Sequence, residues 1–180
     1  MTQIEFSVLR FFDAMTGWAP LDNLVVAFTK LGDAGLIFVL ITTVLLCFRK
    51  TRRIGFYAAV ALVCDLLIVN VTLKPLIDRP RPFTYLQQFG HLISAPRDSS
   101  FPSGHTGAAF AFAFAMLPAG KKWFALSLVF AVAMGLSRLY LTVHFLSDVI
   151  AGAVIGALCG LFSVYAVRKV LAYTNRLGGK

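Results

Sequence analysis

The sequence predicts an all-α fold, a polytopic membrane helix bundle that forms a single domain over residues 1–180. Of its 180 residues, 58% are hydrophobic and only 14% are charged, and the mean hydropathy of +0.79 is far above that of a soluble domain. The hydrophobic residues gather in runs long enough to enter a bilayer as helices. Short clusters of lysine and arginine separate several of these runs, as in multi-pass membrane proteins.

The N-terminal segment, residues 1–31, is expected to form helices at the membrane interface. Residues 4–15 carry apolar side chains at helical spacing, interrupted by Arg10 and Asp13, which predicts an amphipathic helix. Residues 21–31 are too few and too charged to cross a bilayer alone. If the two segments inserted together, they would add one further span.

Five apolar segments are each predicted to cross the membrane as a helix. They are residues 34–48, 54–73, 104–117, 123–136 and 145–167. The bundle is therefore expected to have five transmembrane helices, or six if the N-terminal segments insert. The polar segment 74–103 is predicted to be an external loop, because Pro75, Pro80 and Pro82 interrupt any helix there.

The positions of the basic clusters explain the net charge of +9. Residues 49–53, 120–122 and 168–169 all fall on one face if the five spans alternate, and the positive-inside rule makes that face cytoplasmic. The loop 74–103 and the segment 138–144 then lie on the outer face. Nucleic acid is not an expected partner, since the sequence lacks a basic and aromatic stripe on a soluble surface. The expected partner is the lipid bilayer.

The stretch LSRLYLTVHFLSDVIAG, residues 136–152, places three charged or titratable residues between two apolar spans. His144 and Asp148 are four residues apart, so on a helix the carboxylate can accept a hydrogen bond from the imidazole. Arg138 and His144 would converge if one span ended near the arginine and the next began near the histidine. His144 would then lie in the first helical turn, where backbone N–H groups attract an anion.

Two other segments on the same face are suited to anion binding. In FPSGH, residues 101–105, the capping residue Ser103 and Gly104 precede an apolar helix, which predicts an anion-binding N-terminus. In KPLIDRPRP, residues 74–82, Lys74 ends a span and Arg81 lies in a proline-stiffened extended segment. Three span ends thus bring lysine, arginine, histidine and aspartate to one face, and the ligand that this combination indicates is a phosphate.

These three segments resemble the motifs of the type 2 phosphatidic acid phosphatase family of membrane lipid phosphatases. Residues 74–82 match K-x6-R-P, residues 102–105 match PSGH, and residues 137–148 match S-R-x5-H-x3-D. All three motifs are complete, in order, and at the expected span boundaries. The resemblance is strong over residues 74–152, and outside that range it rests on the hydrophobic pattern.

The resemblance implies catalytic roles for His144, His105 and Asp148. His144 would attack the phosphorus and form a phosphohistidine, Asp148 would hold its tautomer, and His105 would protonate the leaving group and then activate water. The phosphate-binding residues would be Lys74, Arg81, Ser103, Gly104 and Arg138. No metal or other cofactor is expected, since the clustered carboxylates that hold magnesium are missing near the motifs.

Three classes of function are compatible with these features. The favoured one is hydrolysis of a lipid phosphate or diphosphate at the outer face of the cell membrane. Analogy with the family favours undecaprenyl diphosphate as substrate, with phosphatidylglycerol phosphate, phosphatidic acid and lipid A phosphate as alternatives. A lipid phosphotransferase could use the same phosphohistidine. The complete set of His105, His144 and Asp148 disfavours the third class, a non-catalytic lipid or anion transporter.

Several other polar and small residues receive structural explanations. Arg79 is expected to extend its side chain to the lipid headgroups, and Asp78 to orient Arg79 or Arg81. Small residues that recur every four positions predict close packing against another helix of the same chain; these are Gly152, Gly156 and Gly160.

Overall fold

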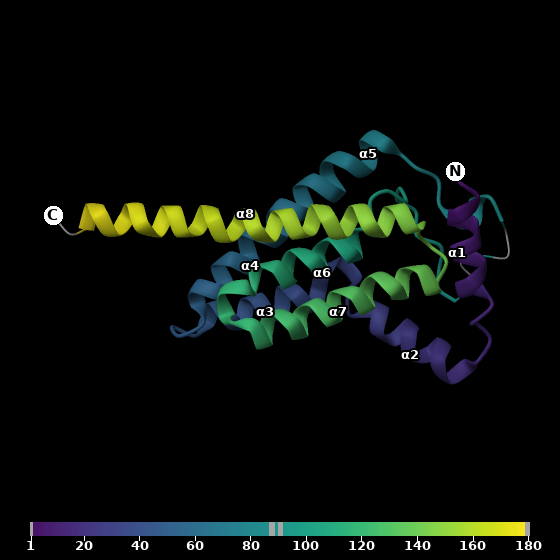
Figure 1. The fold of residues 1–180 in the computed structure, drawn as a ribbon, viewed down its shortest axis with the longest axis horizontal. Coiled ribbons are helices and arrows are strands. Elements are labelled where there is room, and N and C mark those ends of the chain that lie inside the picture. Colours follow the sequence, from purple (N-terminus) through teal and green to yellow (C-terminus); the bar gives the residue numbers. More distant parts are fainter. Residues whose placement is uncertain (1, 87–88, 90–91, 179–180) are drawn as a thin grey trace.

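The protein is all-α, as predicted, in a computed structural model that describes residues 2–86, 89 and 92–178. Every regular element within these residues is a helix (Figure 1). The main helices are α1 (Gln3–Asp13), α2 (Ala19–Lys30), α3 (Leu36–Cys47), α4 (Arg52–Asp65), α5 (Lys74–Ile77), α6 (Gly104–Ala115), α7 (Lys121–Tyr140) and α8 (Leu146–Gly178).

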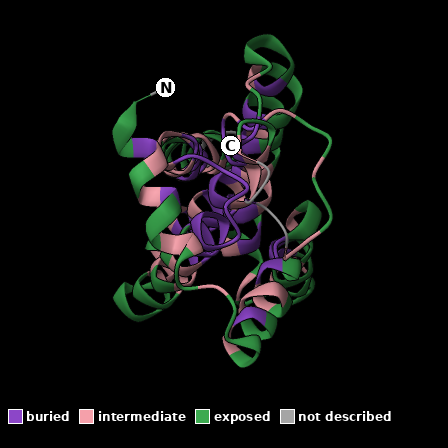
Figure 2. Cartoon of the chain, turned by 90° about the vertical axis from the view of Figure 1, so that its right-hand side faces the viewer, coloured by how far each residue is buried: buried purple, intermediate pink, exposed green. Residues whose placement is uncertain are grey.

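Helix α6 forms the centre of the bundle and packs against α8, α7 and α4. It is rich in alanine and glycine, and most of its residues are buried, which Figure 2 shows as the purple centre of the molecule. The glycine pattern of α8 packs against this helix, as predicted: a Cβ on Gly152 would lie 2.5 Å from the Ser103 carbonyl oxygen, and one on Gly156 would lie 2.2 Å from that of Gly107. These glycines let the two backbones approach closely.

Helix α4 continues without a break into a π-helical segment, Leu66–Leu73, and then into α5. The helix therefore extends one turn beyond the predicted span end at Lys74. Pro75 lies where the π-helical segment gives way to α5. The chain turns at Asp78, whose φ of 42° ends the helix in a left-handed conformation.

The N-terminal helices α1 and α2 lie at the end of the bundle that carries the three polar motifs. Helix α1 lies crosswise at that end and contacts α7 and α8 (Figure 1). Helices α2 and α3 are joined by a short 3-10 turn, Asp33–Gly35, and are bent by 46° relative to each other. Ala34 and Gly35 take left-handed φ values of 51° and 68° there, which produces the bend.

Within the described residues, three helices are long and apolar enough to cross a membrane, and a fourth span arises if the bent pair α2 and α3 is counted as one. The three are Arg52–Thr84, Lys121–Tyr140 and Leu146–Thr174. Helix α6 has 12 residues, about 18 Å of rise, and is therefore shorter than a hydrocarbon core. The expected count of five or six spans, and the interfacial position of α1, stay predictions.

The basic connections and the polar motifs lie at opposite ends of the bundle. The α3–α4 and α6–α7 connections and the C-terminal part of α8 point toward one end, whereas α1, the end of α5 and the α7–α8 connection lie at the other (Figure 1). The three motifs therefore converge on one end, as their spacing predicted.

We expect Gly156→Ala to lower the melting temperature of the detergent-solubilised protein. Alanine would gain about 1 kcal/mol in helix propensity, but its Cβ would lie 2.2 Å from a backbone oxygen of α6 that has no room to move. Overpacking of this kind costs about 1–3 kcal/mol, so the steric effect should dominate. The matched control is Val154→Leu on the outward side of α8, where the side chain is 53% exposed. A higher melting temperature for Gly156→Ala would contradict the packing.

Candidate active site

The three motifs meet around one cavity of about 850 Å³ at the motif-bearing end of the bundle. Six of the eight residues predicted for the site line it, namely Lys74, Arg81, Gly104, His105, Arg138 and His144. The other two, Ser103 and Asp148, are fully buried behind the cavity wall. Lys74 and His144, which are 70 residues apart in the sequence, thus line one cavity.

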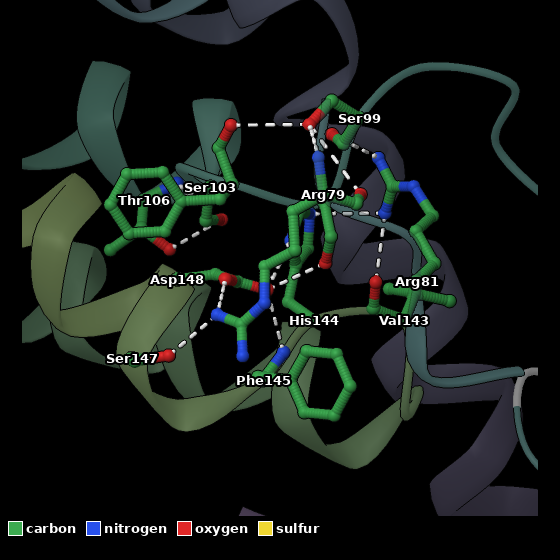
Figure 3. A network of polar contacts seen from close by, with 12 residues as sticks. Arg79, Arg81, Ser99, Ser103, Thr106, Val143, His144, Phe145, Ser147 and Asp148 are labelled. Carbon is green, nitrogen blue, oxygen red and sulfur yellow. Dashed lines mark hydrogen bonds and ion pairs between the residues drawn. The ribbon is translucent and has the colours of Figure 1, made fainter. Parts of the chain in front are cut away.

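The imidazole of His144 lies in the connection between α7 and α8 and is only 1% exposed. Its Nε2 atom is 3.2 Å from NH1 of Arg81 (Figure 3). Because a guanidinium can only donate, Nε2 accepts this hydrogen bond and carries the lone pair, while the ring proton is on Nδ1. Burial, the largest cause, and the charges of Arg81 and Arg138 lower the pKa of His144 to about 3 against the opposing effect of Asp148. The ring is therefore neutral and able to act as a nucleophile at neutral pH.

The carboxylate of Asp148 is completely buried and has several partners. Its Oδ2 atom accepts hydrogen bonds from Ser100 Oγ at 2.5 Å and from the Phe145 backbone N–H at 2.8 Å, and Oδ1 accepts one from Arg79 NH1 at 2.5 Å (Figure 3). The expected hydrogen bond to His144 is not formed: Nδ1 lies 3.6 Å from Oδ2 and has no hydrogen-bond partner among the described residues. Asp148 caps the first turn of α8 by accepting the hydrogen bond of the Phe145 N–H. His144 lies just before this turn.

Lys74 and Arg81 share a carboxylate that the sequence motifs did not include. Asp98 forms an ion pair with Lys74, and its Oδ1 lies 2.7 Å from NH2 of Arg81. Burial alone would raise the pKa of Asp98, but the hydrogen bonds and charges of the two cations lower it to about 2. Arg81 also donates to the carbonyl oxygens of Asp98 and Val143, at 2.9 and 2.8 Å, which fixes its plane.

Arg138 is a deeply buried cation of the cavity that forms no ion pair within the described residues. Its side chain is 3% exposed, NH1 donates to Thr29 Oγ1 at 2.7 Å, and its Nε has no hydrogen-bond partner. A buried charge without a counter-ion is costly, and an anion in the cavity would offset that cost.

His105 faces the same cavity from the first turn of α6 and is paired with an acid from another helix connection. Its Nε2 lies 3.0 Å from Oδ1 of Asp33, in the turn between α2 and α3. Gly32 is needed beside this pair, since a Cβ there would lie 2.8 Å from Cδ2 of His105. The bent α2–α3 turn thus brings a carboxylate to one of the two predicted catalytic histidines.

Ser103 is the N-cap of α6. Its hydroxyl accepts a hydrogen bond from the Thr106 N–H at 3.5 Å and bonds the Thr106 hydroxyl at 2.9 Å (Figure 3). This confirms its capping role, whereas phosphate binding by its hydroxyl stays a prediction. Gly104 follows it and lines the cavity with its backbone.

Two expectations for the loop 74–103 are wrong. Arg79 does not extend to the headgroups: its side chain is 17% exposed and is held by the carboxylates of Asp148 and Glu5. Asp78 forms no ion pair with Arg79 or Arg81 in the described part of the chain, because the left-handed backbone at Asp78 ends α5. Asp98 contacts Arg81 in its place.

Sequence reasoning missed several polar partners of the site, among them Glu5, Thr29, Asp33, Asp98 and Ser100. None belongs to a motif or has a fixed spacing from one. Only Asp33 carried a local signal, because its position between Gly32 and Gly35 indicates a tight turn.

Comparisons with known proteins agree with this geometry. A family model described as the PAP2 superfamily matches residues 50–172. An undecaprenyl-diphosphatase from Sulfolobus acidocaldarius is 33% identical over 147 residues, which are 81% of this chain and 70% of the relative.

Two solved structures have the same fold. Aquifex aeolicus LpxE superposes with a TM-score of 0.80 at 28% identity, covering 91% of this chain and 96% of that one. A transmembrane PAP2-type phosphatidylglycerolphosphate phosphatase from Bacillus subtilis superposes with a TM-score of 0.73 at 26% identity, covering 94% of this chain and 89% of that one.

We expect Arg81→Gln to raise the pKa of His144 from about 3 toward, but not to, its ordinary value. The substitution removes a positive charge next to the ring and so makes protonation less costly, while burial of the ring remains. Imidazole ¹⁵N NMR of the labelled protein in detergent measures this titration. Arg10→Gln, on α1 and outside the cavity, is the control. An unchanged or lower His144 pKa in Arg81→Gln would contradict the electrostatic account.

Proposed function

The chain belongs to the PAP2 superfamily, whose members are phosphatases of lipid phosphate esters, and from this premise we propose that it converts undecaprenyl diphosphate to the monophosphate at the outer face of the cell membrane. The reaction is proposed to be metal-independent and to pass through a phosphohistidine at His144.

The observation that carries this proposal is the charge arrangement of the cavity. Lys74, Arg81 and Arg138 all line it, yet one carboxylate, Asp98, is shared by the first two, and Arg138 has no carboxylate partner among the described residues. A phosphate group would supply the missing negative charge and accept hydrogen bonds from all three side chains. His144, whose Nε2 accepts the hydrogen bond from Arg81, lines the same cavity.

In the first step, Nε2 of His144 attacks the terminal phosphorus. A P–N bond forms as the P–O bond to the leaving lipid phosphate breaks, and protonated His105 gives its proton to that oxygen. The imidazolium of His144 is stabilised by the nearby carboxylate of Asp148. Lys74, Arg81, Arg138 and the Gly104 N–H bind the equatorial oxygens as charge develops on them.

In the second step, the phosphohistidine is hydrolysed. His105, now neutral, takes a proton from a water molecule that attacks the phosphorus, and the P–N bond breaks to restore His144 and release inorganic phosphate. Asp33 would hold the ring of His105 in place through both proton transfers, since it lies 3.0 Å from Nε2.

A lipid substrate is supported by the apolar side of the cavity. Val39 of α3 and Val63 and Leu66 of the α4 helix line it, and all three are at least half exposed on the outside of the bundle. Such a wall lets a lipid headgroup enter sideways from the leaflet while its chain stays in hydrocarbon. The choice of undecaprenyl diphosphate rests on the name of the Sulfolobus relative, and phosphatidylglycerol phosphate, phosphatidic acid and lipid A phosphate are the alternatives to be compared.

The outer face is proposed from the charge distribution. The basic segments 49–53, 120–122 and 168–169 all belong to connections or helix parts at the end remote from the cavity. Short basic loops stay in the cytoplasm, so the cavity end would face the periplasm or the exterior.

Purified protein in detergent should release inorganic phosphate from undecaprenyl diphosphate at least about tenfold faster than from the three alternative lipids, and a chelator should leave the rate unchanged. Phosphate release on each lipid, with and without EDTA, is the measurement. Transfer of the phosphate to a second lipid would instead identify a phosphotransferase. Loss of activity with EDTA would overturn the metal-independent mechanism.

His144→Ala should abolish turnover, and Arg138→Gln should lower kcat about 100-fold, the usual cost of removing one transition-state donor. Enzyme given substrate ³²P-labelled in its terminal phosphate and quenched in alkaline detergent should carry base-stable, acid-labile label in the wild type and none in His144→Ala. Arg97→Gln is the control: Arg97 lies in the loop 74–103 but outside the cavity, and the variant should turn over normally. Near-normal turnover by His144→Ala would refute the covalent mechanism.

A further inference from the structure

Arg79 connects three segments of the chain at the back of the site. Its NH1 atom donates to Asp148 Oδ1 at 2.5 Å and to Ser147 Oγ at 2.7 Å, and its NH2 atom donates to both carboxylate oxygens of Glu5, at 3.0 and 3.2 Å. Figure 3 shows the guanidinium facing Asp148 and Ser147 at the start of α8. Arg79 does not line the cavity, so a bound phosphate would not contact it.

Glu5 of α1 completes a closed set of contacts around this guanidinium. Its carboxylate is largely buried, with the residue 8% exposed, and Ser147 Oγ donates to its Oε1 at 2.5 Å. Ser147 therefore accepts from Arg79 and donates to Glu5, which holds all three side chains in one geometry. Partners that are buried and fully hydrogen-bonded have few alternative rotamers.

Aromatic contacts reinforce the same arrangement. The Arg79 guanidinium lies 4.3 Å above the centre of the Phe145 ring, and Phe6 of α1 packs edge-on against that ring at 5.8 Å. Phe145 is the residue between His144 and α8, so its position sets where the backbone of His144 lies. Helix α1 thus makes two kinds of contact here: Glu5 pairs with Arg79, and Phe6 packs against Phe145.

The orientation of Asp148 follows from these contacts. Three donors hold its carboxylate, and among the described residues only Arg79 donates to Oδ1, while Oδ2 is the oxygen turned toward Nδ1 of His144. Without the arginine, Oδ1 would be left buried and unpaired, and the carboxylate would be held only at Oδ2, by Ser100 and the Phe145 N–H.

We infer that Arg79, held by Glu5 of the N-terminal helix, is a positioning residue that fixes Asp148 against the nucleophile His144. The inference rests on the proposed function, since it assigns Asp148 and His144 their roles in the reaction. Because neither Arg79 nor Glu5 contacts the substrate, their loss should slow formation of the phosphohistidine and leave substrate affinity almost unchanged.

The test is a double-mutant cycle with the full-length protein in detergent. Arg79→Gln should lower kcat about 10- to 100-fold, the range for groups that orient a reacting residue, with KM within about threefold of the wild type. Glu5→Gln, which keeps the shape of the side chain, should lower kcat about three- to tenfold. If Glu5 acts through Arg79, adding Glu5→Gln to Arg79→Gln should cause no further loss.

The same experiment separates positioning from stability and from the proposed reaction. Guanidinium ion should restore part of kcat to Arg79→Ala, since a merely structural loss would not respond to it in this way. Arg10→Gln, on the same helix as Glu5 but exposed, is the control and should match the wild type. Wild-type kcat in both Glu5→Gln and Arg79→Gln would overturn the inference while leaving the proposed reaction intact; persistence of activity in His144→Ala would overturn the reaction itself.

Discussion

The buried carboxylate of Asp148 is the group on which the assembly of the site depends. A fully buried charge must be hydrogen-bonded and paired, or it costs several kcal/mol. Here the partners come from three segments: Arg79 after α5, Ser100 before α6, and the Phe145 N–H at the start of α8. The Ser103 N–H also donates to the Asp148 backbone oxygen at 3.0 Å. Satisfying one residue therefore brings together the three span ends that carry the motifs.

Sequence spacing predicted the parts of the fold that local geometry controls. The helical class, the three converging motifs and the packing of the α8 glycines all follow from periodicity or from fixed offsets within one segment. The 3.6-residue period could not predict the capping of α8 by Asp148, which folds the carboxylate back onto Phe145 and leaves His144 Nδ1 at 3.6 Å. In that case a local backbone donor outcompeted the expected side-chain partner.

The missed residues are those whose partners depend on how separate segments pack. Glu5 lies 74 residues before Arg79, and Asp33 lies 72 residues before His105, so no local pattern relates them. Arg79 and Arg81 are only two residues apart, yet Arg79 contacts Glu5 of α1 and Asp148 whereas Arg81 lines the cavity. Arg81 belongs to the K-x6-R-P motif, whereas the role of Arg79 depends on the position of α1, which supplies Glu5.

Because Asp98 already pairs with Lys74 and Arg81, a phosphate that binds these two cations has to displace a carboxylate. A phosphate that contacts Lys74 and Arg81 has to replace Asp98, whose side chain is 53% exposed and can be hydrated once it is released. The ion pairs lost and gained at these two cations are therefore of similar strength. Arg138 differs, because it has no carboxylate to give up within the described chain and its Nε has no partner. The net gain on binding should thus come mainly from Arg138, the cation that is most deeply buried and least compensated beforehand.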